Sequence, residues 1–354
     1  MRDKIYINGI AGISAQPEAA VFSGEITGYV ENIFSAVAPH YKEYIPAMQL
    51  RRMSTGIKMG LTAAKISLND AGVEVPDAII TGTGEGAKQD TEKFLQAMLV
   101  QQEEMLSPTS FIQSTHNTIG GQIALNLKCN GYNMTYSQIS ASLESALADS
   151  LLLLREDPTV KNVLAGGVDE ISEKITGFQK LDGQVKKERV KNLDLLMTDS
   201  PGTIISEGAH FFSLSSEKKD GSYAVLRDVE IFNAEDPEEV SKKISAFLQR
   251  NSVEKNETLT VFFGKNGDNR FDYFYTHLQR GIFSEKNQLA WKHLAGDYDT
   301  STGFAIKTAC EIFKAGYIPE ILKLNIKTPA PTGQILIYNQ YLGENHSLVL
   351  LSSP

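Results

Sequence analysis

Apolar residues recur along this chain at two spacings, one typical of helices and one typical of strands. They mark one face of a helix at residues 57–68, which Gly72 can end, and again at residues 143–154, which Pro158 can end. The same spacing predicts helices at residues 237–248 and 306–313. Short apolar runs predict strands at residues 4–10, 78–80, 133–137, 163–165, 209–214, 223–232, 258–263, 334–338 and 347–351.

The order of these elements predicts the fold class. Strands and helices alternate, which favours an α/β fold with mostly buried sheets. Two parts of similar element order are expected, with a polar seam at residues 216–221, so we predict halves at residues 1–215 and 216–354.

Composition and charge narrow the functional classes. With 42% hydrophobic and 22% charged residues among 354, the chain has the composition of a globular protein and not of a disordered or collagen-like one. The net charge of −9 disfavours non-specific binding of nucleic acid. No apolar run approaches the length of a membrane span, and residues 1–14 predict a strand and not a secretory signal. We therefore expect a cytoplasmic protein.

Several common sites are disfavoured by the sequence. Two cysteines, Cys129 and Cys310, cannot form a disulfide framework or a four-thiolate metal site. The six histidines show no metal-binding spacing, so we expect neither a metal nor a cofactor. The pattern Gly82-x-Gly84-x-x-Ala87 resembles a dinucleotide-binding turn. The acidic residues about 20 positions later lie in a helical stretch, which favours a simple tight turn.

The segment of residues 131–154 turns abruptly from a strand into a helix near residues 137–140. Unpaired N–H groups at a helix N-terminus favour an anion, so a cysteine at this position would be an activated nucleophile. The turn holds Ser137, Gln138, Ile139 and Ser140, and no cysteine. A serine would need an adjacent general base.

At this point the chain resembles the β-ketoacyl-ACP synthases, which are condensing enzymes of the thiolase fold. The resemblance rests on six segments taken together, in order and spacing: IYINGIAGIS (5–14), TGTGEG (81–86), NTIGG (117–121), AGGVDE (165–170), SEGA (206–209) and NQYLGENHSL (339–348). It implies a thiolase-like α/β fold with two pseudo-duplicated βαβαβ halves in a layered α-β-α-β-α arrangement.

The catalytic residues of that family are a cysteine, which takes the acyl group, and two histidines, which stabilise the oxyanion. By resemblance the cysteine position falls on Ser140, or on Ile139 or Gln138 if the alignment slides. The first histidine position falls loosely on Asn266. The pattern Lys-x-x-x-Gly-His of the second histidine looks shortened to Lys292-His293.

The missing cysteine indicates a chain-length-factor-like subunit as the leading hypothesis. Such a subunit pairs with an active ketosynthase, or with a second copy of itself, and shapes the acyl tunnel in type II polyketide or fatty-acid-like biosynthesis. The short chain also resembles ketosynthase-like proteins of aryl polyene and flexirubin-type clusters. The resemblance implies these tunnel-lining candidates: Phe111, Ile112, Gln113, Gln138, Ile139 and Gly343.

Two other functions stay open on the sequence. One is an active acyltransferase or malonyl-ACP decarboxylase that uses Ser140 with His293 as its base. The other is a non-catalytic docking module for an acidic acyl carrier protein, which a group of basic residues would attract. These residues are Arg51, Arg52, Lys186, Lys187 and Lys191.

Overall fold

The computed structural model describes residues 4–253, 258–327 and 333–354. The strands are β1 (Ile5–Ile13), β2 (Ala78–Gly82), β3 (Tyr132–Tyr136), β4 (Asn162–Asp169), β5 (Gly208–Ser215), β6 (Ala224–Asn233), β7 (Leu259–Phe263), β8 (Asn287–Ala290), β9 (Lys323–Asn325), β10 (Gln334–Tyr341) and β11 (Asn345–Ser352). The helices are α1 (Ala20–Ser23), α2 (Ala47–Leu50), α3 (Thr55–Ala71), α4 (Lys88–Val100), α5 (Pro108–Gln113), α6 (Thr118–Leu127), α7 (Ser142–Glu156), α8 (Glu173–Leu181), α9 (Pro237–Arg250), α10 (Asp272–Arg280), α11 (Lys292–Ala295) and α12 (Thr302–Ala315).

The strands join edge to edge in the order β3-β2-β4-β5-β1-β6-β11-β10-β7-β8-β9. The first five strands along the chain take the spatial order third, second, fourth, fifth, first. Strands β8, β7, β10, β11 and β6 repeat that order, with the short β9 added at the far edge. The two sets meet where Ile5–Ile7 of β1 pair with three residues of β6. The repeated order is the pseudo-duplication expected from the resemblance, whereas the domain boundary near residue 215 stays a prediction.

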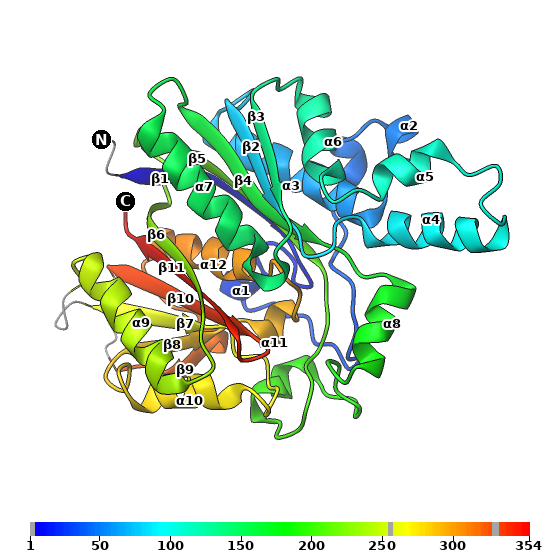
Figure 1. The fold of residues 1–354 in the computed structure, drawn as a ribbon. Coiled ribbons are helices and arrows are strands. Elements are labelled where there is room, and N and C mark those ends of the chain that lie inside the picture. The colour runs from blue at the N-terminus through cyan, green and yellow to red at the C-terminus, as the bar shows by residue number, and fades with distance from the viewer. Residues whose placement is uncertain (1–3, 254–257, 328–332) are drawn as a thin grey trace.

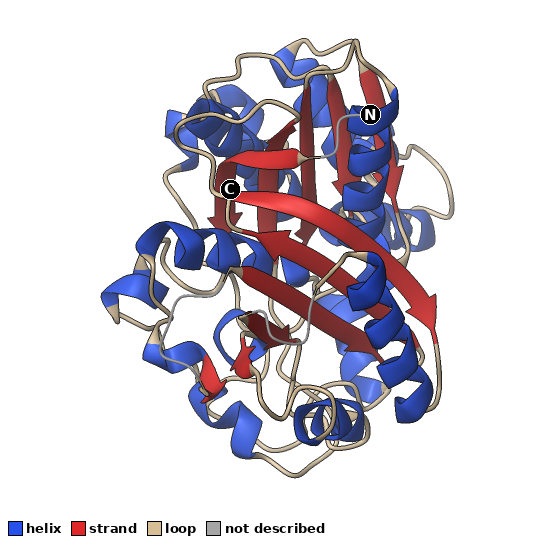
Figure 2. Cartoon of the chain, turned by 90° about the vertical axis from the view of Figure 1, so that its left-hand side faces the viewer, coloured by secondary structure: helices blue, strands red, loops and turns tan. Residues whose placement is uncertain are grey.

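Helices cover both faces of each half and also lie between the halves (Figures 1 and 2). Between them lie α7, which packs on β2, β4 and β6, and α12, which packs on β1, β5 and β10. Helices α3 and α6 cover the outer face of the first half, and α9 and α10 cover that of the second. Three buried apolar clusters lie between the sheet and these three helix layers, because each helix buries one apolar stripe against the sheet.

The apolar spacing of the sequence explains these helices. The residues at helical spacing in 57–68 are the buried face of α3, and Gly72 ends that helix with a φ of 63°. No helix among the described residues is long and apolar enough to cross a membrane.

Helices α4 and α5 form an arm that projects from the body of the molecule (Figure 1). Only Lys88 and Asp90 of α4 are buried, and no residue of α5 is. The arm exposes Leu95, Leu99, Val100, Met105, Phe111 and Ile112. An apolar surface of this kind on a projecting element is typical of an interaction site.

Candidate functional site

The strand-to-helix turn lies where the sequence predicts it, between the end of β3 and the start of α7. Ile139 has a φ of 49° and is 48% exposed, whereas Ser140 next to it is only 8% exposed. A positive φ is costly for a β-branched residue, so the surrounding structure must hold this turn in place. The residue with positive φ at this turn is thus an exposed isoleucine, which offers no nucleophile.

A serine hydroxyl holds the turn together. Ser142 Oγ accepts a hydrogen bond from Gln138 N–H at 2.8 Å, and its proton reaches the carbonyl oxygens of Ile139 (2.6 Å) and Thr83 (3.0 Å). The end of β2 approaches so closely that a Cβ on Gly82 would lie 2.5 Å from the Ser142 carbonyl oxygen. Glycine at position 82 is thus required by close packing and not by positive φ.

Behind the turn lies an enclosed polar cavity of about 50 Å³. Such a volume holds a few water molecules but no acyl chain. Five carboxylic residues and three cationic residues line it, so its wall carries an excess of acidic groups. These are Asp169, Glu170, Asp268, Asp297 and Asp299, with Lys88, Arg270 and Lys292; Ser140, Asn266 and Tyr341 also contribute to the wall.

Three residues of this wall form one bonded group. Asp297 Oδ1 lies 2.7 Å from Lys292 Nζ, and Asp297 Oδ2 accepts a hydrogen bond of 2.7 Å from Asn266 Nδ2. The carboxylate therefore neutralises the lysine and takes one of the two amide N–H groups. A fixed negative charge beside both donors makes the site less able to stabilise an oxyanion.

His293 does not belong to this group. It is buried, its Nε2 lies 2.9 Å from the carbonyl oxygen of Ile321, and it does not line the cavity. Burial lowers its pKa to about 4. The geometry does not support the shortened motif with His293 as second histidine, which stays a prediction. The pattern Lys-x-x-x-Gly-His also fits Lys292 and Gly296 without a gap, with Asp297 where the pattern has its histidine.

The spacing to Gly296 was the signal that could have found Asp297 from sequence. Asn266, whose alignment was loose, lies beside Asp297 in the structure. Ser140 does line the cavity, but no imidazole accompanies it there. The pairing of Ser140 with His293 as a base is therefore not supported by the geometry, because a base must come within hydrogen-bond reach of the proton it removes.

The glycine turn after β2 binds the protein's own carboxylates. Gly84 N–H donates to Asp169 Oδ1 at 2.8 Å, and a Cβ on Gly84 would collide with the Asp299 carboxylate. A dinucleotide would need those N–H groups for its pyrophosphate. The turn is therefore a packing feature, as the sequence favoured, and only Gly86 within it has a positive φ.

Asp169 and Asp299 differ in their bonding. Asp169 accepts hydrogen bonds from Gly84, from Thr83 and from both the N–H and the hydroxyl of Thr300. Burial raises the pKa of Asp299 to about 8, with Asp169 as a further cause. Burial raises the pKa of Asp169 as well, and Lys88 together with the hydrogen bonds from Thr300 and Gly84 opposes that rise.

Lys88 at the start of α4 balances this charge. Burial lowers the pKa of Lys88, but Glu85, Asp299 and Asp169 outweigh that effect and raise it above the usual value. Lys88 also forms an ion pair with Glu85. The base of the arm is therefore anchored in the acidic cluster behind the turn.

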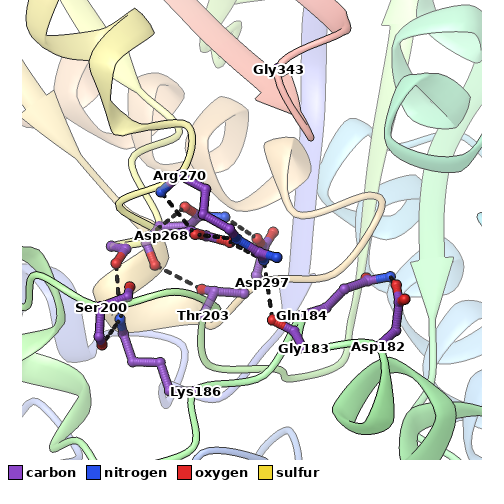
Figure 3. A network of polar contacts seen from close by, with 12 residues as sticks. Asp182, Gly183, Gln184, Lys186, Ser200, Thr203, Asp268, Arg270, Asp297 and Gly343 are labelled. Atoms are coloured by element: carbon purple, nitrogen blue, oxygen red, sulfur yellow. Dashed lines mark hydrogen bonds and ion pairs between the residues drawn. The ribbon is translucent and has the colours of Figure 1, made fainter.

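A polar network closes the other side of the cavity (Figure 3). Lys186 Nζ donates to the carbonyl and hydroxyl oxygens of Ser200 and to the Gly267 carbonyl, each within 3.0 Å. Thr203 Oγ1 donates to the Asn266 carbonyl at 2.8 Å, and Arg270 pairs with Asp268. Two loops, one after α8 and one after β7, are tied together over the cavity.

Lys186 is only 1% exposed, so its predicted role in carrier-protein docking is wrong. Its ammonium group is consumed by the interior bonds of the network. Lys187 and Lys191 are exposed, as are Arg51 and Arg52. These two pairs do not share a surface patch, because α2, which precedes Arg51, and the loop after α8 lie at opposite ends of the molecule in Figure 1.

The tunnel-lining candidates fall into three places. Phe111, Ile112 and Gln113 lie on α5 of the arm, where Gln113 Nε2 donates to the Arg52 carbonyl at 2.9 Å. Gln138 and Ile139 lie in the turn, but neither residue lines the cavity, whereas Ser140 does. Gly343 lies in the tight connection of β10 and β11 with a φ of 73°. Their role toward a tunnel stays a prediction.

Neither cysteine lines the cavity among the described residues. Cys310 is buried in α12, and Cys129 Sγ contacts the Pro76 carbonyl oxygen. No cluster of metal-ligating side chains is found within residues 4–253, 258–327 and 333–354.

Comparisons with known proteins agree with the layered fold. Residues 32–202 match the family model described as the N-terminal domain of β-ketoacyl synthases. A search of curated protein sequences found no significant match.

Three solved structures illustrate the likeness of fold. The ishigamide ketosynthase/chain length factor matches with a TM-score of 0.82 and 17% identity, covering 100% of both chains. A type II PKS acyl-carrier protein in complex with its ketosynthase bound to the hexaketide (AntDE:AntF) has a TM-score of 0.77 and 14% identity, covering 99% of this chain and 100% of that one. A β-ketoacyl synthase from Burkholderia phymatum STM815 has a TM-score of 0.78 and 14% identity over the same shares. The predicted thiolase-like α/β fold is confirmed.

Proposed function

We propose that this ketosynthase-like chain is a non-condensing, chain-length-factor-like subunit that pairs with an active ketosynthase in type II polyketide or related biosynthesis. The observation that carries the proposal is the bonded group of Lys292, Asp297 and Asn266 at the two histidine positions. Together with Ile139 and Ser140 at the turn, it leaves no thiol and no imidazole where condensation needs them.

The ion pairs of the cavity argue against a decarboxylase. A malonyl group carries a carboxylate, and two cations that could bind it, Arg270 and Lys292, are already paired with Asp268 and Asp297. The volume of about 50 Å³ also leaves no room for an acyl group on Ser140 in this conformation. We therefore place acyltransferase and decarboxylase activity behind the non-condensing role.

The exposed apolar arm supports pairing with another chain. Phe111 and Ile112 are 56% and 61% exposed, and the Phe111 ring contacts Phe94 of α4 within the arm. Aromatic and aliphatic side chains that a partner covers usually supply much of the binding energy of an interface. We expect these two side chains to lie against the acyl tunnel of the partner ketosynthase.

The test is co-expression with a ketosynthase that carries the cysteine and both histidines. The two chains should copurify and, with carrier protein and malonyl extender, give a product of defined length by mass spectrometry. Phe111→Ala should shift that length, because it removes a wall of the tunnel. Leu181→Ala, an exposed apolar residue of α8, is the matched control and should not. Condensation by this chain alone, or a failure to copurify, would refute the proposal.

A further inference from the structure

One carboxylate ties the projecting arm to a neighbouring helix. Glu92, on the second turn of α4, accepts hydrogen bonds at Oε1 from the N–H groups of Lys174 at 2.8 Å and of Ile175 at 2.7 Å. Both donors belong to the first turn of α8, for which the preceding Ser172 provides no side-chain cap within the described residues. Glu92 therefore caps α8 from a different helix, because the free N–H groups of a helix start need acceptors.

The charge of Glu92 suits this place. Burial alone would raise its pKa, but hydrogen bonds at the start of α8 outweigh that effect and lower the pKa below its usual value. The side chain is therefore an ionised carboxylate at neutral pH, and it faces the positive end of the α8 dipole. Replacing the carboxylate by an amide would keep an acceptor oxygen but would remove this charge.

A second residue of α4 faces the same segment. Gln89 Nε2 donates to the carbonyl oxygen of Ile171 at 3.0 Å, and Gln89 N–H donates to Glu170 Oε1 at 2.9 Å. Gln89 and Glu92 are three positions apart, so they lie on one face of α4. This face lies against the start of α8, next to the root of the arm (Figure 1). Two anchoring points fix the direction of a helix axis, whereas Gln89 alone would leave the axis free to tilt.

Beyond Glu92 the arm is weakly held by packing. Among the described residues, none from 93 to 100 and none of α5 is buried. A further bond to α8, from Lys174 Nζ to Gln96 Oε1 at 3.0 Å, is exposed to solvent. The bond that joins α5 to the Arg52 carbonyl is exposed as well. A segment with few buried contacts and exposed hydrogen bonds opens easily, so the direction of the arm depends on the bonds at its root.

The length of the arm magnifies a change at its root. Val100 lies about 12 Å beyond Glu92 along the helix axis, so a tilt of about 10° at Glu92 would move Val100 by about 2 Å. Helix α5 follows α4, because the two pack together and the ring centroids of Phe94 and Phe111 lie 5.3 Å apart. The direction of α4 therefore decides where Phe111 and Ile112 lie.

We propose that Glu92 is a positioning residue that fixes the direction of the arm against α8 and thereby the length of the product. The effect on product length rests on the proposed function, whereas the direction of the arm is a property of this chain alone. An experiment on the arm therefore separates a failure of this inference from a failure to pair with a ketosynthase.

The direction of the arm is measured by electron paramagnetic resonance on the full chain without a partner. Nitroxide labels are attached to Glu104→Cys, at the arm tip, and to Glu74→Cys, in the loop after α3, in a Cys129→Ser background; both labelled sites are exposed. Labelled chain is diluted with unlabelled chain, so that distances within one chain dominate. Glu92→Ala should widen the distance distribution about twofold or more, and Glu92→Gln should widen it less. Glu173→Ala, which removes an exposed acidic group from the same turn of α8, is the matched control and should not widen it.

A product assay with an active ketosynthase adds a second readout. Glu92→Ala should spread the product over more chain lengths by mass spectrometry, and Glu92→Gln should restore most of the original distribution. A residue that only stabilises the fold would lower the yield of every product equally and leave the distribution unchanged, and that result would overturn the role in product length. Equal widths of the distance distribution in Glu92→Ala and the unmodified chain, or an equal widening by Glu173→Ala, would overturn the positioning role.

Discussion

Glu170 offers the sharpest test of how the acidic cluster is built. Its side chain is 1% exposed, yet it holds the first turns of two helices. Oε2 accepts from Gly56 N–H of α3 at 2.6 Å, and Oε1 accepts from Gln89 N–H of α4 at 2.9 Å. Burial nevertheless raises the pKa of Glu170 to about 7, and the perturbation that we choose is Glu170→Gln.

The magnitude follows from the two pKa values. A carboxyl with a pKa of 4.5 when unfolded and about 7 when folded changes the free energy of unfolding by about 3 kcal/mol. Because the folded pKa is raised, this stability is fully present below about pH 4.5. It is lost as the pH rises through about 7, so Glu170 makes the protein less stable toward alkaline pH.

The assay is urea unfolding of the full chain at about pH 5 and about pH 8.5. Glu170→Gln should shrink the difference between the two free energies of unfolding by about 3 kcal/mol. Its stability should fall at about pH 5, because an amide cannot accept from both N–H groups. At about pH 8.5 the relief of the buried charge offsets that loss, so the slope is the readout. Glu74→Gln, an exposed site, is the control. An unchanged pH slope in Glu170→Gln would refute the reasoning.

Three further predictions concern packing and the loops. In the same urea assay, Gly84→Ala should lower the free energy of unfolding by about 3 kcal/mol or more, because its Cβ would collide with an aspartate. Gly121 is a helical glycine with open space around it, so Gly121→Ala should leave that free energy unchanged or raise it by up to about 1 kcal/mol. Lys186→Met should lower the free energy of unfolding by about 3 kcal/mol and speed proteolysis of the loop after α8, whereas the exposed Lys187→Met should do neither. Equal digestion rates of the two variants would show that Lys186 does not hold the two loops together. Ile139→Asn should raise the melting temperature, since asparagine tolerates the positive φ, and a lower value would show that no strain is stored there.

The sequence predicts the four longest helices of the described residues, α3, α7, α9 and α12, because apolar spacing reports directly on burial. The stripe at residues 57–68 and the one at residues 143–154 are both buried faces, in α3 and α7. The sequence also predicts the strand-to-helix turn at residues 137–140, because only a few residues separate the strand from the helix that follows it. These features depend on neighbours along the chain, and so a single sequence contains them.

Features that depend on distant packing could not be predicted in this way. The run of residues 186–191 is strongly basic and looks like a solvated face, yet the backbone directs Lys186 inward to the loop after β7. Gly84 is required by Asp299, which lies more than 200 positions later in the chain. Asp297 follows Gly296 directly, as the histidine does in the pattern Lys-x-x-x-Gly-His. The sequence indicates Asp297 only if the histidine is taken to be replaced at that position, and not if a histidine is sought nearby.

The cavity shows why a site that lacks catalytic groups can stay polar. Asp169 lines it and accepts hydrogen bonds from the backbone N–H groups of Gly84 in the glycine turn and of Thr300. Replacing that carboxylate by an apolar residue would leave buried donors unpaired, at about 1–3 kcal/mol each. A buried carboxylate in turn requires cations such as Lys88. Asp297 likewise gives Lys292 a fixed counter-ion, so the charges of this part of the wall balance each other. The fold's own unpaired donors, rather than catalysis, are then sufficient reason for the charges to remain.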